Sequence, residues 1–344
     1  MHPLEYTIGQ ILSSEPLKLN GCRVMVGVSG GADSMALLHI LAALRGPLTI
    51  SLVAAYIDHG LRPEETPAEW QCVREAANRL GLECARVPVD VTGTASARKL
   101  SLEHAARELR YQAFADLGRK YATDALAVAH TADDQVEELL LRLLRGGGRK
   151  ALSGMALQSG NVIRPLLAVR KSALLAYLAD QGIGFCLDSS NDNLRFVRNR
   201  IRHDLLPLLE SRYDPGVRQA LLKTAANLRE DEDLLALLLA EHWGLAVELR
   251  EPDSKHPVAA LLRRHLFRSL HPALQRRMVE QLLWTIGETA RYEQIMAVVE
   301  AARSGRTGSE LHLSRGLRVG VTREHLEFSY PRGRVPWRGR LHPR

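Results

Sequence analysis

The stretch from Val24 to Leu38, with the sequence VMVGVSGGADSMALL, limits the possible folds more than any other part of the chain. An apolar run from Val24 to Val28 has the composition of a buried strand, and a polar turn with two glycines follows it. Helix-like residues resume directly after this turn. Glycines let the backbone approach a ligand closely, and amide groups at a helix N-terminus favour anions. The stretch therefore predicts a strand, a phosphate-binding turn and a helix in direct succession.

Six residues form this turn: Ser29, Gly30, Gly31, Ala32, Asp33 and Ser34. The usual nucleoside triphosphate loop has a lysine before its final Ser or Thr, whereas this chain has Asp33 there. A carboxylate beside phosphates is suited to hold Mg²⁺. The turn resembles the PP-loop, SGGxDS, of ATP pyrophosphatases, which split ATP between the α and β phosphates to adenylate a substrate. The resemblance implies ATP and Mg²⁺ as cofactors, all six turn residues as nucleotide-binding candidates, and Asp33 as the metal ligand.

Apolar runs and helical patterns alternate along the first half of the chain. Strands are predicted at Leu48 to Ile57, Cys84 to Val89 and Ala125 to Ala129, and helices at Thr66 to Leu80, Leu102 to Tyr121 and His130 to Arg145. This alternation predicts right-handed crossovers and an α/β fold with a doubly wound parallel sheet. Ligands bind such sheets at the carboxyl ends of the strands. Because the PP-loop, Asp58-His59 and His130 all lie at those ends, we expect them to share one site.

A second polar cluster, His130 to Glu137 (HTADDQVE), follows the fourth predicted strand and opens a helix. Acidic residues in a first helical turn commonly complement the helix dipole, which is one interpretation. Asp133 and Glu137 are four residues apart and share a helix face, so they could instead act at the mouth of the nucleotide site. The residues alone leave both interpretations open.

Together these segments resemble the tRNA(Ile)-lysidine synthetase family of PP-loop enzymes. HTADDQVEELLLRLLRGGG (His130 to Gly148) is similar to the family's HHxDDQxETxLxRLLRGxG. LDSSNDNLRFVRNRIRHDLLPLL (Leu187 to Leu209) is similar to its DxSNxxxxxxRNxIRxxLxPxL. Three shorter segments also match: AAYIDHGLRPE from Ala54, LSGM from Leu152 and IRPLL from Ile163. Thr131 and Glu138 depart from the family pattern, which has His and Thr at these places.

The resemblance implies a ligase that forms a C–N bond. The enzyme would use ATP to join L-lysine to C2 of the wobble cytidine in the CAU anticodon of tRNA(Ile), through an adenylated tRNA intermediate, and would release AMP and diphosphate. The lysidine product would switch decoding from AUG to AUA. Five residues are the catalytic candidates: Asp33, His130, Asp133, Arg198 and Arg202. His130 and Asp133 would position the substrates or take a proton. Partners would be tRNA(Ile) and L-lysine, with a second copy of the chain, as a homodimer, a further candidate.

The segment RFVRNRIRHDLL predicts an amphipathic helix that ends near Pro207. At about 100° per residue, one polar stripe carries Arg195, Arg198, Asn199 and Arg202. The apolar sector carries Val197, Ile201 and Leu205, with Arg200 at its edge. A solvated basic face would explain this pattern as well. The match of Arg198, Asn199 and Arg202 to the family's RNxIR favours contacts with phosphate or pyrophosphate, because guanidinium groups form bidentate hydrogen bonds with them.

The chain is expected to contain three parts. Residues 1–212 are predicted as the PP-loop ATP-binding catalytic domain, 213–302 as a helical tRNA-binding domain and 303–344 as a small β meander with a basic tail. Helical patterns are predicted throughout Val217 to Val299, and glycines separate short alternating stretches between Ser304 and Tyr330. The tail after Tyr330 is expected to be a basic arm. The resemblance further implies that the full extra C-terminal domain of longer family members is missing.

Composition limits the alternatives. A formal charge of +7 permits a polyanionic partner. The four cysteines are too far apart for a CxxC pair, which argues against a zinc or iron–sulfur site and against a rival PP-loop enzyme, a thiouridine or thiocytidine synthase. The intact SGGADS argues against a non-catalytic RNA-binding protein. No signal peptide and no apolar run near the roughly 18 residues of a membrane span is visible, so a cytoplasmic protein without membrane contact is expected.

Overall fold

The computed structural model describes residues 1–187, 196–250 and 258–330. The chain forms two compact units, Met1–Leu228 and Arg229–Pro343, and the division falls inside the long helix α12 (Val217–Ala246). Each unit has its own sheet, and each is described separately below. Arg195 and the basic tail after Tyr330 lie outside the described residues.

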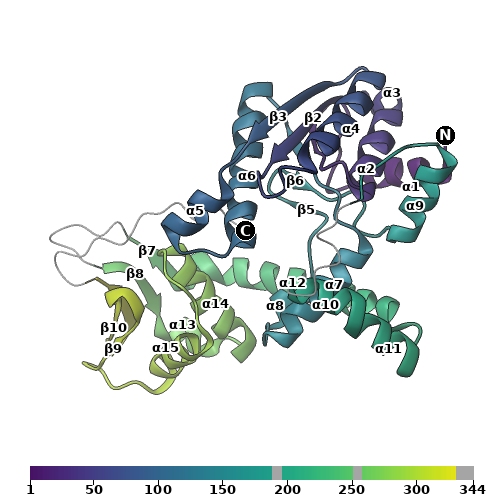
Figure 1. Ribbon diagram of the computed structural model, residues 1–344. Coiled ribbons are helices and arrows are strands. Elements are labelled where there is room, and N and C mark those ends of the chain that lie inside the picture. Colours follow the sequence, from purple (N-terminus) through teal and green to yellow (C-terminus); the bar gives the residue numbers. More distant parts are fainter. Residues whose placement is uncertain (188–195, 251–257, 331–344) are drawn as a thin grey trace. The chain divides into compact units, whose positions relative to one another are not determined.

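Unit 1 is built on a sheet of six strands in the order β3-β2-β1-β4-β6-β5 (Figure 1). Their bounds are β1 Arg23–Gly27, β2 Ser51–Asp58, β3 Glu83–Pro88, β4 Ala125–Ala127, β5 Gln158–Ser159 and β6 Val162–Ile163. The strands from β3 to β6 are parallel, and the short edge strand β5 is antiparallel to β6. The order reverses on either side of β1, so the predicted doubly wound α/β sheet is confirmed, with the PP-loop at its switch point.

The helices of unit 1 follow the predicted alternation closely. Their bounds are α1 Pro3–Ser13, α2 Ala32–Ala43, α3 Arg45–Leu48, α4 Thr66–Arg79, α5 Val91–Arg98, α6 Leu102–Tyr121, α7 Ala132–Leu144, α8 Arg149–Leu152, α9 Lys171–Asp180, α10 Val197–Arg200 and α11 Leu206–Arg212. Helix α5 forms where the sequence favoured no element. It begins because the Asp90 side chain caps it, accepting a hydrogen bond of 2.8 Å from the Gly93 amide.

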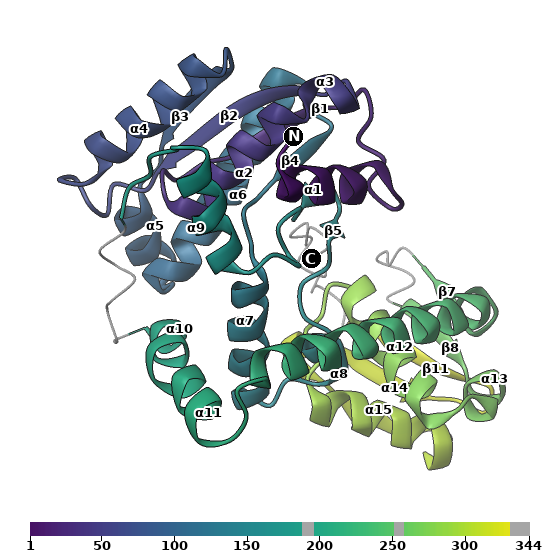
Figure 2. The ribbon, with the colours of Figure 1, turned by 90° about the vertical axis from the view of Figure 1, so that its right-hand side faces the viewer.

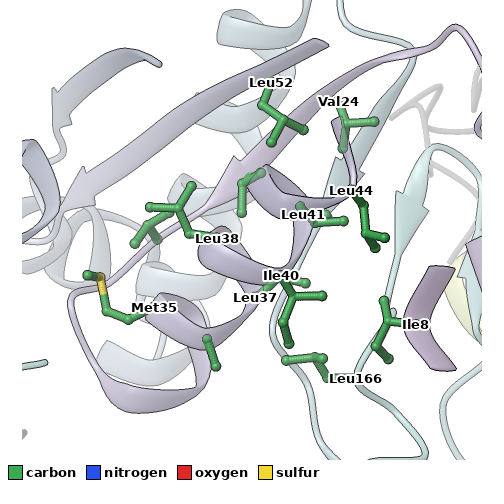
Figure 3. Close-up of a cluster of buried hydrophobic side chains, with 14 of the residues drawn as sticks. Ile8, Val24, Met35, Leu37, Leu38, Ile40, Leu41, Leu44, Leu52 and Leu166 are labelled. Atoms are coloured by element: carbon green, nitrogen blue, oxygen red, sulfur yellow. The ribbon is translucent and has the colours of Figure 1, made fainter. Parts of the chain in front are cut away.

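Both faces of the unit 1 sheet are buried, because alternate residues of each strand enter different cores. Val24 and Val26 of β1 point into a core with α1, α2 and α9, whereas Met25 points to the other face and packs with Phe114 and Leu117 of α6. Figure 3 shows the first core around α2, with side chains leaving the helix in several directions. A helix that is apolar on all sides must be enclosed, so the start of α2 is held rigidly.

The segment after residue 196 departs from the predicted helix. It starts as α10, widens into a π-helical turn at Ile201–Leu205, and continues as α11, beside α7 (Figure 2). The prediction that this helix ends near Pro207 was wrong. The Leu206 amide donates to the Ile201 carbonyl, five residues earlier, so the regular pattern of helical hydrogen bonds is already interrupted there. Pro207 has no N–H, and it can follow this interruption without ending the helix.

Unit 2 contains an antiparallel sheet in the order β7-β8-β11-β10-β9. The bounds of its elements are β7 Val247–Leu249, β8 Val258–Arg263, α13 Arg264–Ser269, α14 Pro272–Thr285, α15 Tyr292–Ser304, β9 Glu310–His312, β10 Arg318–Val321 and β11 His325–Ser329. The predicted meander is confirmed as β9, β10 and β11. The prediction of helix throughout 217–299 was wrong at β7 and β8, because β8 pairs with β11, which follows it by more than sixty residues.

The core of unit 2 joins its helices and strands. Met278 and Leu282 of α14 and Val298 of α15 pack in one cluster with Leu262 of β8 and Phe328 of β11. The predicted boundary at residue 302 therefore runs between elements that share a core. In the described parts of the chain, we find no helix with the length and apolar character needed to cross a membrane.

Candidate active site

The PP-loop connects β1 to α2 and is folded by its own serines. Gly30 has a φ of +85°, a conformation that side chains rarely adopt, and Gly31 is the N-cap of α2. The Ser34 hydroxyl donates to the Gly31 carbonyl at 2.9 Å and accepts from the Ser29 amide at 3.1 Å. Because Gly31 has no side chain to cap α2, the first amides of the helix are available to an anionic ligand.

Neighbouring segments hold the loop closely. A Cβ built on Gly30 would lie 3.4 Å from both the Cα and the carbonyl oxygen of Glu69 in α4. On the other side, the Cys186 amide donates to the Gly30 carbonyl at 2.9 Å. The turn therefore has little freedom to change shape, which suits a preorganised anion site.

Asp33 is the second residue of α2 and has two different oxygens. Its Oδ2 lies 3.6 Å from the Lys171 ammonium nitrogen. Its Oδ1 is buried and has no hydrogen-bond donor among the described residues. Burial raises the pKa of this carboxyl group, although Lys171 opposes the shift. A buried carboxylate oxygen without a donor, beside a phosphate-binding turn, fits a Mg²⁺ ligand, because Mg²⁺ is usually held by one or two carboxylates together with substrate phosphates.

Two histidines follow the strands on either side of β1. Burial lowers the pKa of His59, after β2, to about 4, and the pKa of His130, after β4, to about 4 as well. Arg110 of α6 contributes to both shifts. The Nδ1 atom of each ring is buried and has no hydrogen-bond partner within the described ranges. Both imidazoles are therefore neutral near pH 7, and His130 can accept a proton or a hydrogen bond from a substrate.

A cluster of two carboxylates and two guanidinium groups joins α7 to the segment after residue 196. We call Asp134, Glu137, Arg198 and Arg202 the acid–arginine cluster. Glu137 is only 1% exposed and accepts from Arg198 Nε at 2.8 Å and from Arg202 Nε and Nη2 at 2.6 and 3.0 Å. Asp134 accepts from Arg198 Nη2 at 2.9 Å. Asp134 and Arg202 also influence the pKa of Asp33, so the cluster lies near the PP-loop.

Asp133 lies outside the acid–arginine cluster, although Asp134, the next residue, belongs to it. Its Oδ2 accepts from the Lys171 amide at 2.7 Å, and its Oδ1 accepts from Arg218 Nη1 at 3.1 Å. Asp133 thus fixes the start of α9 and binds α12. Asp134, by contrast, completes a capping box with Thr131, whose amide and hydroxyl both donate to Asp134 Oδ2 at 2.8 Å.

Two further side chains at the site had no signal in the sequence analysis. Lys171 pairs with Asp33, and Arg110 is a guanidinium that is mostly enclosed, with a pKa lowered first by burial and then by Arg107 and Arg198. In the described ranges no carboxylate pairs with Arg110, which suits an anionic ligand. Gln135 accepts from the Met155 amide at 2.6 Å and so supports the LSGM segment. Only long-range packing brings these residues together.

Two of the four cysteines are neighbours, which their spacing in the sequence did not suggest. Cys72 Sγ lies 4.0 Å from the Gly184 carbonyl oxygen, and Cys186 Sγ lies 3.8 Å from that of Ala68. Burial, and next the neighbouring Cys186, raise the pKa of Cys72 to about 11. In the described residues, we find no group of three or more His, Cys, Asp or Glu side chains that could hold a metal ion.

The comparisons with known proteins agree with this geometry. The PP-loop domain family matches residues 2–209. The tRNA(Ile)-lysidine synthase of Geobacter sulfurreducens is 36% identical over 316 residues, which cover 91% of this chain and 65% of that protein. The enzyme of Bacillus subtilis is 32% identical over 332 residues, 94% of this chain and 69% of that protein. The chain belongs to the tRNA(Ile)-lysidine synthase family.

The chain spans about two thirds of the length of these family members. Among solved structures, the U34-tRNA thiolase NcsA from Methanococcus maripaludis, with its [4Fe-4S] cluster, superposes with a TM-score of 0.56 over 66% of this chain and 78% of that chain. At 16% identity this likeness shows a common fold alone. Membership of the lysidine synthase family rests on the sequence relatives and on the PP-loop.

The predicted site residues fall into two groups in the structure of this family member. The PP-loop, with Asp33, and His130 lie at the carboxyl edge of the sheet, as predicted. Arg198 and Arg202 project to the same side of their helix, as predicted, and each donates to the Glu137 carboxylate of α7. Asp133 bonds to the backbone of α9 and to α12, so its assigned role as a proton acceptor remains a prediction.

Proposed function

We propose that the chain is a tRNA(Ile)-lysidine synthase, an ATP-dependent ligase that forms a C–N bond. It would adenylate the wobble cytidine in the CAU anticodon of tRNA(Ile), join L-lysine to C2 of that base, and release AMP and diphosphate. The observation that carries the proposal is the preorganised PP-loop with Asp33 beside it, in a chain that aligns with lysidine synthases over nine tenths of its length.

The geometry supports an adenylating chemistry. The amides at the start of α2 and the backbone around Gly30 would bind the phosphates of ATP. Asp33 would hold Mg²⁺, which supplies charge neutralisation at the phosphates when it is bound. Adenylation converts the cytosine C2 oxygen, a poor leaving group, into a good one, and the amine of lysine then attacks C2. Removal of a proton from that amine requires an unprotonated base, and His130 is unprotonated near pH 7.

The acid–arginine cluster would orient groups around this chemistry. Glu137 holds Arg198 and Arg202 in fixed positions, so the positive charge of these side chains would attract an anion with little further loss of side-chain entropy on binding. Arg110 has no carboxylate partner among the described residues and would attract the same anion. The proposal therefore places the phosphates between the PP-loop and these three guanidinium groups.

A thiolation enzyme is the alternative to consider, because two cysteines lie beside the PP-loop. The relatives favour ligation of lysine, since four proteins that align over nine tenths or more of the chain are named tRNA(Ile)-lysidine synthase. Partners would be tRNA(Ile), L-lysine and, in a homodimer, a second copy of the chain. A cytoplasmic location follows from the proposed substrates.

The direct test is to incubate the protein with ATP, Mg²⁺, labelled L-lysine and bulk tRNA. Label should appear in tRNA(Ile) alone, with one AMP released for each lysine joined. Omission of lysine should still allow adenylation of the tRNA and release of diphosphate. Absence of label from tRNA, while labelled sulfur from a persulfide donor enters it, would replace this proposal with the thiolation alternative.

A further inference from the structure

Lys171 is the first residue of α9 and lies beside the PP-loop. Its backbone is fixed twice, because its amide donates to Asp133 Oδ2 at 2.7 Å and because Leu174, Tyr177 and Leu178 of the same helix are buried against the core around α2. Its side chain is 39% exposed. The ammonium group can therefore change partners while the helix that carries it stays in place.

The ion pair of Lys171 with Asp33 is loose. The distance of 3.6 Å from Nζ to Oδ2 exceeds that of a strong charge-assisted hydrogen bond, which is about 2.7–2.9 Å. The Asp33 side chain is 26% exposed, so a ligand at the PP-loop can reach both groups. In this arrangement Lys171 supplies a positive charge to Asp33, as a bound cation would.

A phosphate chain at the PP-loop changes this balance. Bound ATP would add several negative charges at the loop, and Asp33 would hold the Mg²⁺ that accompanies the phosphates. The Lys171 ammonium, anchored one side-chain length from the same loop, is left with phosphate oxygens as the best available acceptors. Lys is a common phosphate ligand because it acts as a compact point charge.

We propose that Lys171 is a further catalytic residue, whose ammonium group exchanges Asp33 for the β or γ phosphate of ATP and stays on the pyrophosphate as it leaves. This assignment rests on the proposed function. When the cytidine oxygen attacks the α phosphorus, the bond to the bridging oxygen breaks and its electron pair stays on pyrophosphate. Lys171 remains protonated throughout and neutralises the charge that develops on that oxygen. Asp133 acts as a positioning residue for Lys171.

Binding measurements test the assignment without turnover. Titration calorimetry with ATP, pyrophosphate and AMP, each with Mg²⁺, should be compared for the wild type, Lys171→Met, Lys171→Arg and the exposed control Lys120→Met on α6. Lys171→Met should lower the affinity for ATP and for pyrophosphate roughly tenfold or more, as expected for a lost hydrogen bond between charged groups. Its affinity for AMP should stay within about twofold of the wild type. Lys171→Arg should retain most of the affinity, and Lys120→Met should match the wild type.

The outcomes separate this inference from the proposed function. A wild-type protein that binds no ATP would overturn both. Normal ATP affinity in Lys171→Met, or an equal loss of affinity for ATP and AMP, would overturn the assignment of Lys171 to the leaving phosphates and would not affect the proposed function. Lys171 could instead act only by neutralising the charge of Asp33. To test this, Lys171→Met is combined with Asp33→Asn. If Lys171 binds phosphate, the double variant should bind ATP roughly tenfold more weakly than Asp33→Asn, and if Lys171 only neutralises Asp33, the two variants should bind ATP equally. Thermal melts show that each variant is folded.

Discussion

Arg202→Ala should destabilise unit 1 by leaving Glu137 short of a partner. Glu137 is 1% exposed and cannot turn to water, whereas Arg202 is 25% exposed. The substitution removes the hydrogen bonds of 2.6 and 3.0 Å, and among the described residues Glu137 keeps that of Arg198 at 2.8 Å. Removal of one partner from a buried ion pair costs about 3–5 kcal/mol, and because Arg198 remains we expect about 3 kcal/mol.

Hydrogen exchange of peptides from α7 and α10 is the appropriate assay, since the chain has two compact units and a global melt would mix them. Arg200→Ala is the matched control, because Arg200 is exposed on the same helix and should change stability by less than about 0.5 kcal/mol. Addition of Glu137→Gln to Arg202→Ala should restore stability, because it removes the uncompensated charge while Arg198 keeps Asp134. A double variant less stable than Arg202→Ala would refute this reasoning.

Three other expectations follow from the site. Asp33→Asn removes the charge proposed to hold Mg²⁺ and should slow adenylation by about 10²-fold or more at saturating Mg²⁺, measured as diphosphate release. His59 and His130, with folded pKa values of about 4, bind fewer protons than in the unfolded chain between pH 4 and 6.5. Stability should therefore fall as the pH is lowered through that window, by up to about 1.4 kcal/mol per pH unit per histidine in denaturation series. Gly30→Ala places a side chain next to Glu69 on a residue with positive φ. It should lower the stability of the fold by about 1–2 kcal/mol and weaken ATP binding measured by calorimetry.

The sequence predicted the first half of the fold well because its signals are local. Apolar runs, glycine turns and helix periodicity mark the strands and helices from β1 to α7, and the polar residues after each strand mark the edge where ligands bind. The strand β8, with the sequence VAALLR, lacks such a signal. A short apolar run fits a strand or a buried helix equally well, and only pairing with β11 decides between them.

The site was harder to predict than the fold. Helical spacing showed that Asp133 and Glu137 share a face, but it could not show how α7 is rotated against its neighbours. The rotation directs Asp133 to α9 and α12 and encloses Glu137 between two arginines. Lys171 had no motif at all. Its role depends on a contact with Asp33, 138 positions away in the chain, which no local pattern reports.

The two hydrogen bonds of Asp133 also bear on the order in which unit 1 folds. One carboxylate closes two loops of the chain, of 38 residues to Lys171 and of 85 residues to Arg218. Closing such loops costs chain entropy that local helices and neighbouring strands avoid. We therefore expect β1, β2 and β3, which are consecutive strands, to pair first, and the start of α7 to join α9 and α12 later, so that the nucleotide site is completed late in folding.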